Sequence, residues 1–302
     1  MRTNASYRSG VIAAVLAALC WGSATVMSKG ALSRFAPVSL LVIQLTASVT
    51  VLWGMVWLRR PSSVAWRDVA RFGVLGLLEP GLAYLLGLTG LASTEASGAT
   101  LIQASESVMI VVASAILFRE RPTGRFVVLS LMALCGLLLA LGAMTPDETT
   151  SGFGGTLLIV AGTASAAIYV VLSGKFATKI DPTYIVAWQQ TVALAFAIFM
   201  LPIEWSLQPA SRVLPNDAGI WVLACVSGIV QYALAFSLYM TALKSVSANT
   251  AGSFLNLVPL IGLAGAFVFL REELSTIQVI GAAVTIVAVT LISLGKQGVV
   301  AD

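Results

Sequence analysis

The chain has 302 residues, of which 58% are apolar and only 10% are charged. A soluble globular protein carries about 25% charged residues, so this composition leaves too few charges to cover a water-facing surface. The sequence contains no histidine, which excludes Ser-His and Cys-His catalytic pairs and histidine metal sites. Its three cysteines are too few for a disulfide framework. We expect an integral membrane protein that uses no cofactor and no metal.

Apolar runs of about 20 residues, the length that crosses a bilayer as a helix, recur along the whole chain. They predict an all-α membrane protein with ten spanning helices, at 10–29, 38–58, 71–91, 96–118, 125–144, 154–174, 184–203, 218–243, 248–270 and 276–295. The first run follows Arg2 and Arg8, a pattern that also fits a cleaved signal peptide. Nine further apolar runs favour a membrane helix instead.

The distribution of lysine and arginine predicts the orientation of the spans. With the N-terminus in the cytoplasm, 13 of the 17 basic residues fall in cytoplasmic segments, and four fall outside: Lys29, Arg34, Arg212 and Arg271. We therefore expect both termini in the cytoplasm and a multi-pass protein of the inner (plasma) membrane, with the lipid bilayer as its surroundings.

Two polar segments of the first half have counterparts in the second half. SKGALSRFAP at 28–37 resembles SGKFATKIDP at 173–182, an offset of 145 residues. LFRE at 117–120 resembles FLRE at 269–272, an offset of 152 residues. Ordered matches outside the apolar runs indicate an internal repeat, because shared apolar composition does not explain them.

Each half contains five predicted helices, and five is an odd number. The second half must then enter the membrane in the opposite direction, as in transporters whose site lies at the repeat interface. We expect a first five-helix repeat at 1–150 and a second, inverted repeat at 151–302. The offset of 145 also pairs Gln44 with Gln189, both off the midplane, which favours interhelical hydrogen bonding for these side chains.

Short motifs occur in a characteristic order across both halves: CWGS at 20–23, Tyr239 with Ala242 and Leu243, LVP at 257–259, LRE at 270–272, and Gly281. In this order the chain resembles the drug/metabolite transporter superfamily, specifically its ten-helix EamA-type exporters. It is most similar to the YddG-type exporters of aromatic and neutral amino acids. The resemblance covers nearly the whole chain, although Glu106 and Ser107 stand where the second half has Val258 and Pro259.

The resemblance implies a secondary transporter that exports a small molecule by alternating access and works as a monomer. It implies no nucleic-acid partner. An intramembrane enzyme fits less well, because the chain lacks histidine and its aspartates lie outside the predicted spans. A channel also fits less well, because the sequence has no pore-loop signature.

Two acidic residues, Glu79 and Glu106, are predicted to lie deep within spans. At 1.5 Å per residue they are about 18 and 15 Å from the helix ends, near the middle of a hydrocarbon core about 30 Å thick. A charge there costs at least about 2.5–3.5 kcal/mol, and no lysine or arginine is predicted deep within the spans. We expect one or both to line a transport cavity and to carry a coupling proton or hold a substrate ammonium. A structural role is the alternative, above all for Glu79, which precedes Pro80.

Polar and aromatic residues at helical spacing accompany these acids. Asn249, Ser253 and Asn256 share one face of the ninth helix, and Gln103 shares a face of the fourth with Glu106. The predicted substrate cavity comprises Trp21, Glu79, Tyr84, Gln103, Glu106, Gln231, Tyr232, Tyr239, Ser253 and Asn256. Helix packing and interhelical hydrogen bonds are the alternative interpretation.

Two prolines, Pro80 and Pro259, are predicted within spans and are hinge candidates, with static kinks as the alternative. No lysine or arginine is placed to hold phosphate, so we expect a neutral, zwitterionic or cationic small-molecule substrate. The resemblance implies aromatic or other neutral amino acids. Other neutral or cationic metabolites or drugs are the alternative.

Overall fold

The computed structural model describes residues 4–59, 66–118, 121–142, 149–175, 181–245, 254, 257–271, 273, 275–294 and 299–300. The first half contains α1 (Asn4–Ala31), α2 (Pro37–Arg59), α3 (Trp66–Leu75), η1 (Leu77–Leu82), α4 (Ala83–Ala92), α5 (Ala96–Ala104), α6 (Glu106–Phe118), β1 (Arg121–Pro122) and α7 (Gly124–Gly142). The second half contains α8 (Thr149–Lys175), α9 (Pro182–Leu207), η3 (Pro209–Arg212), α10 (Ala218–Gly228), η4 (Ile229–Leu234), α11 (Ala235–Ser245), α13 (Leu257–Gly265), η5 (Ala266–Leu270), α14 (Thr276–Leu294) and β2 (Val299–Val300).

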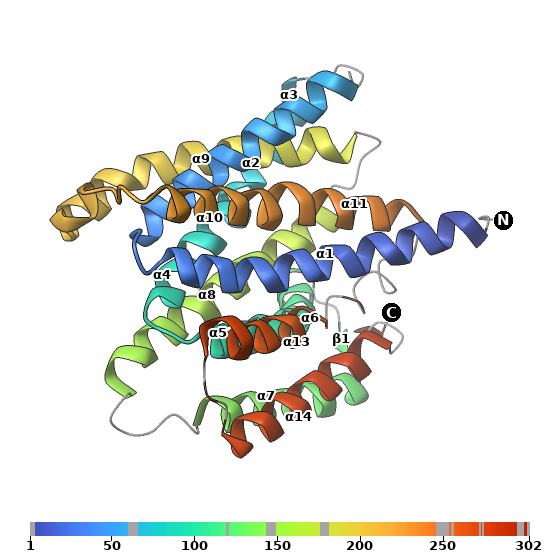
Figure 1. The fold of residues 1–302 in the computed structure, drawn as a ribbon. Coiled ribbons are helices and arrows are strands. Elements are labelled where there is room, and N and C mark those ends of the chain that lie inside the picture. The colour runs from blue at the N-terminus through green and yellow to red at the C-terminus, as the bar shows by residue number, and fades with distance from the viewer. Residues whose placement is uncertain are drawn as a thin grey trace.

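The described chain is a bundle of helices, and β1 and β2 form one short antiparallel pair. Figure 1 shows that α1 begins and α14 ends at the same side of the bundle. Local sequence explains several helix starts. The Asp181 side chain accepts from the Thr183 N–H at 2.9 Å, with Pro182 in the first turn, and Asp217 accepts from the Gly219 N–H at 2.8 Å. Such N-caps satisfy backbone donors that a helix leaves unpaired.

Six of the described helices are long and apolar enough to cross a membrane. α5 and α6 make a seventh if this pair, bent by 40°, is one broken span. Three shorter apolar helices lie at 127–136, 257–270 and 276–288. Each of the ten predicted spans therefore overlaps an apolar helix in the described part of the chain, while ten membrane crossings remain a prediction.

Two of the predicted spans are not continuous helices. Within 71–91 the chain breaks at Glu79, whose backbone is extended (φ −145°, ψ 126°), and Pro80 follows with no N–H to donate. The Ser165 hydroxyl of α8 donates to the partly buried Leu78 carbonyl at 3.0 Å. Within 96–118 the helix is interrupted at Ser105, between α5 and α6. The hinge candidate Pro80 therefore lies at a break, whereas Pro259 is buried within α13; movement at either proline stays a prediction.

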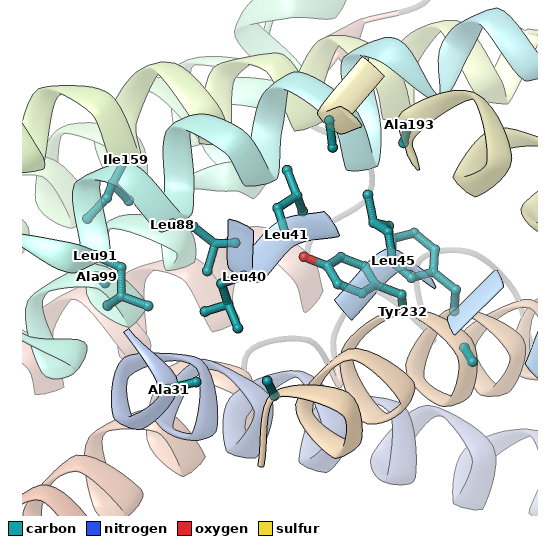
Figure 2. Close-up of a cluster of buried hydrophobic side chains, with 14 of the residues drawn as sticks. Ala31, Leu40, Leu41, Leu45, Leu88, Leu91, Ala99, Ile159, Ala193 and Tyr232 are labelled. Atoms are coloured by element: carbon teal, nitrogen blue, oxygen red, sulfur yellow. The ribbon is translucent and has the colours of Figure 1, made fainter. Parts of the chain in front are cut away.

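The apolar core lies around α2. Figure 2 shows Leu40, Leu41 and Leu45 of α2 among side chains from other helices, including Leu88, Leu91, Ile159, Ala193 and Tyr232. All of these residues are nearly or completely inaccessible to solvent. α2 packs chiefly against α9, α7 against α14, α1 against α11, and α4 against α8. The core is thus assembled from helices of both halves.

Buried polar links join α2 to α9 along their length. The Ser48 hydroxyl donates to Gln190 Oε1, and the Trp53 indole N–H donates to the Thr191 hydroxyl at 3.0 Å. Near one end of the pair, Arg59 donates to the Thr183 hydroxyl at 3.2 Å. The Ser48–Gln190 bond is buried and satisfies polar atoms that have no access to water, whereas the other two are partly buried.

Gln44 and Gln189, which the sequence offset relates, form hydrogen bonds to neighbouring helices, as predicted. Gln44 Nε2 donates to the Ser28 hydroxyl of α1 at 2.9 Å and to the Ser227 hydroxyl of α10 at 2.7 Å. Gln189 Oε1 accepts from the Tyr169 hydroxyl of α8 at 2.9 Å. The prediction that these two residues join helices is therefore confirmed.

Two glycines sit where helices meet at these glutamines. A Cβ atom on Gly76, which precedes η1, would lie 2.7 Å from the Gln189 carbonyl carbon. A Cβ on Gly228, which precedes η4, would lie 2.7 Å from the Gln44 carbonyl carbon. Only glycine allows these backbones to approach so closely.

Candidate functional site

The two predicted intramembrane acids lie close to each other. Glu79 occupies the helix break in η1, and Glu106 is the first residue of α6. Their carboxyl groups interact electrostatically. Both side chains are half-buried, so they are surrounded by protein while part of their surface remains accessible. The two chain breaks thus each place one carboxyl at the same site.

Aromatic rings from both halves surround these acids. The Trp21 ring of α1 meets Phe236 and Tyr239 of α11 edge to face, with centroid distances of 5.3 and 5.5 Å. The Tyr84 ring of α4 meets Tyr232 of η4 edge to face at 4.8 Å. Edge-to-face geometry is the favoured arrangement for such pairs, so the wall is well packed.

Tyr84 is the residue that connects the carboxyls to the aromatic wall. Its phenol interacts with Glu79, Glu106, Gln231 and Trp21. We name these five residues the acidic cluster. Gln231 and Trp21 lie beside the Tyr84 hydroxyl, and Glu79 and Glu106 lie near enough to act on it electrostatically, so the five residues belong to one region of the bundle.

Two buried polar atoms of the acidic cluster make no hydrogen bond of good geometry: the Trp21 indole Nε1, which lies beside the Tyr84 hydroxyl, and the Gln231 amide Oε1. The first is a donor and the second an acceptor. Gln231 is only 6% exposed. Buried polar groups are normally hydrogen-bonded, so these atoms are available for a molecule that enters the cluster.

The structure brings together seven of the ten predicted cavity residues. Trp21, Glu79, Tyr84, Glu106, Gln231, Tyr232 and Tyr239 form one group.

Of the other three predicted cavity residues, Gln103 alone lies among the described residues. Gln103 lies in α5, and the interruption at Ser105 breaks the continuous helix on which it was expected to share a face with Glu106. Ser253 and Asn256, together with Asn249 on the same predicted face, lie outside the described residues.

One buried acid was missing from the sequence analysis. Glu204 was expected just beyond the seventh span, but α9 continues to Leu207 and Glu204 is only 7% exposed. Its carboxyl accepts from the N–H groups of Val38 and Ser39 at 2.6 and 3.0 Å and from the Ser39 hydroxyl at 2.6 Å. It therefore caps the start of α2 and lies outside the acidic cluster. Pro37 marks that helix start in the sequence, but nothing there indicates a partner 165 residues away.

A basic residue also has a structural partner that the sequence does not indicate. The Lys29 ammonium, near the end of α1, donates to the carbonyls of Leu91, at 2.8 Å, and Thr94. It satisfies carbonyls at the end of α4. In the described part of the chain, no group of three or more acidic or cysteine residues is placed to hold a metal ion.

A model of the EamA-like transporter family matches residues 8–142 and again 153–294. Together the two matches cover most of the chain. The chain belongs to the EamA-like transporter family. The predicted membership of this family is thereby confirmed, and the helices described above belong to a multi-pass membrane transporter.

Relatives of this EamA-like transporter are also named as transporters. It is 23% identical to the uncharacterized transporter sll0355 of Synechocystis, over 98% of this chain and 93% of that one. It is 26% identical to the uncharacterized transporter YcxC of Bacillus subtilis, over 92% and 90% of the two chains. A crystal structure of a protein with 19% identity has the same fold, with a TM-score of 0.65 over 94% of this chain and 96% of that one.

Proposed function

We propose that this EamA-like transporter is a ten-helix secondary transporter built from two inverted repeats, at 1–150 and 151–302, and that it works by alternating access. The two family matches support this division, because their first residues are 145 apart and their last residues are 152 apart. These are the offsets that relate the repeated sequence segments. An inverted repeat provides two states that open to opposite sides of the membrane.

Paired features of the structure also support the repeat. The π turns η1 and η4 are 152 residues apart, as are Gly76 and Gly228. Each glycine packs against one of the paired glutamines, Gly76 against Gln189 and Gly228 against Gln44. The packing of α4 on α8 corresponds to that of α11 on α1 when the halves are exchanged.

The acidic cluster supports the proposal that substrate passes through the centre of the bundle, because its residues come from both halves. Trp21, Glu79, Tyr84 and Glu106 come from the first half, and Gln231 comes from the second. A site shared between the halves changes its access when one half moves relative to the other. The breaks at Glu79 and Ser105 provide the irregular backbone that membrane transporters place at such sites.

For the substrate, we propose export of aromatic or other neutral amino acids from the cytoplasm across the inner membrane, by a monomer with both termini inside. Aromatic rings in the cluster suit an apolar side chain. In the described structure the cluster contains no lysine or arginine, which phosphate recognition requires. Other neutral or cationic metabolites are the second candidate.

Transport is tested with purified protein in liposomes loaded with radiolabelled substrates of several classes, without ATP and with or without a pH gradient. We expect flux of neutral or aromatic amino acids above that of protein-free vesicles. If no amino acid moves faster than in protein-free vesicles while another class does, the substrate proposal fails and transport stands. If no class moves, the transport proposal fails.

The role of Glu106 is tested by the pH dependence of that flux. Glu106→Gln removes the titrating carboxyl and keeps the side-chain shape, so we expect a changed pH profile. Glu204→Gln is the matched control, because it removes a buried carboxyl outside the acidic cluster. An unchanged profile in Glu106→Gln would assign Glu106 a structural role.

A further inference from the structure

We propose that the acidic cluster is an ammonium-binding site that selects amines over amino acids, because a carboxylate on the ligand weakens its binding. This inference rests on the proposed transport function and, for the ligand of the same site, favours cationic metabolites, the second candidate above, over amino acids. It predicts a ligand with a primary amino group on an aromatic or alkyl body.

The two carboxyl groups of the cluster are the first argument. Glu79 and Glu106 interact electrostatically with each other and with tyrosines, and in the described structure no lysine or arginine interacts with them. A buried carboxylate needs an opposite charge or hydrogen-bond donors. A ligand ammonium provides both.

The number of hydrogen-bond acceptors is the second argument. A primary ammonium has three N–H donors. The cluster offers three acceptors around Tyr84: the two carboxyls and the unpartnered Gln231 Oε1. An amide oxygen that is buried without a partner gains a hydrogen bond when this ligand enters.

The aromatic wall is the third argument. Trp21 and Tyr84 interact with each other beside the carboxyls, and their rings pack against Phe236, Tyr239 and Tyr232. The face of an aromatic ring attracts a cation, most strongly when the site excludes water. The same rings accommodate the apolar body of the ligand.

The acidic cluster offers fewer favourable interactions to a ligand carboxylate than to a ligand ammonium. The unpartnered donor in the cluster is the Trp21 indole N–H. A carboxylate would exchange its hydration for this donor while it faces Glu79 and Glu106, and like charges at one site disfavour each other. Glu79, Glu106, Trp21 and Tyr84 are all half-buried, so a small molecule can contact them.

Three probes with the same phenylethyl body test this inference: phenethylamine, phenylalanine and 3-phenylpropionate. Their binding to the purified full-length protein in detergent is measured by isothermal titration calorimetry at one pH. We expect phenethylamine to bind about tenfold more tightly than phenylalanine, the effect of one charge-assisted hydrogen bond or its loss. We expect no binding of 3-phenylpropionate. Equal or tighter binding of phenylalanine, or failure of phenethylamine to bind, overturns the proposal.

Two variants and a control locate the site. Glu79→Gln and Glu106→Gln should each weaken phenethylamine binding about tenfold, by the same reasoning, whereas Glu204→Gln should leave it unchanged. Wild-type affinity in both cluster variants overturns the proposal. The wild-type probe series decides the question if a variant does not fold. Liposomes that move amino acids but show no preference for amines refute only this inference, and the transporter function stands.

Discussion

The contact of Gly76 with α9 leads to the sharpest prediction of stability. The backbone of Gly76 is right-handed helical (φ −60°, ψ −21°), so alanine fits it without strain. An added Cβ would lie 2.7 Å from the Gln189 carbonyl carbon and closer still to its oxygen, whereas ordinary contact begins at 3.4 Å. The obstructing atoms belong to the backbone of a helix and cannot rotate away. Gly76→Ala must therefore push α3 and η1 away from α9.

The size of the effect follows from two opposing contributions. Overpacking of a close contact costs about 1–3 kcal/mol, and backbone obstruction belongs at the upper end. Replacement of glycine by alanine within a helix raises the unfolding free energy by up to about 1 kcal/mol. For a chain of 302 residues, the net loss of about 2 kcal/mol corresponds to a melting temperature lower by about 3 °C.

The matched control is Gly87→Ala in α4, where an added Cβ meets nothing within 4 Å. We expect this variant to melt at or slightly above the wild-type temperature. The assay is thermal unfolding of detergent-solubilised protein, followed by circular dichroism. Equal melting temperatures for Gly76→Ala and Gly87→Ala would refute the close approach of η1 to α9.

Three further predictions concern other features. Glu204→Ala removes three hydrogen bonds from the start of α2 and should lower the unfolding free energy by about 1–3 kcal/mol; a wild-type melting curve would contradict the capping role. Tyr169→Phe removes the bond to Gln189 and should cost about 1 kcal/mol, whereas Tyr7→Phe, at a half-exposed position, should cost nothing measurable. A C-terminal fusion to a reporter that is active only outside the cytoplasm should be silent, and reporter activity would disprove the predicted topology.

The helices were predictable because lipid imposes a strong rule on the sequence. Backbone polar groups must be satisfied within a spanning segment, so apolar runs of helix length mark helices directly. Glu79, Glu106 and the aromatic residues of η4 and α11 could be predicted as a group, because intramembrane acids are rare and costly. Pro80 also indicated the irregular backbone beside Glu79.

Other parts of the site depend on contacts that no local pattern records. The cap of α2 by Glu204 joins residues 165 and 166 positions apart. The interruption at Ser105 has no proline or glycine beside it, so helical periodicity continues through it. The unpartnered atoms of Trp21 and Gln231 become evident only when all neighbouring helices are in place.

The offset of 152 residues bears on how the acidic cluster evolved. It relates Glu79 to Gln231 and Glu106 to Val258. If both halves carried the residues of the first half, the bundle would contain four such carboxyls where it now contains two, and each charge adds at least about 2.5–3.5 kcal/mol to the cost of insertion. Two halves encoded as separate stretches of one gene can diverge at these positions, whereas a dimer of identical halves cannot. In the proposed repeat, divergence of the two halves thus permits one of them to carry both carboxyls of the cluster.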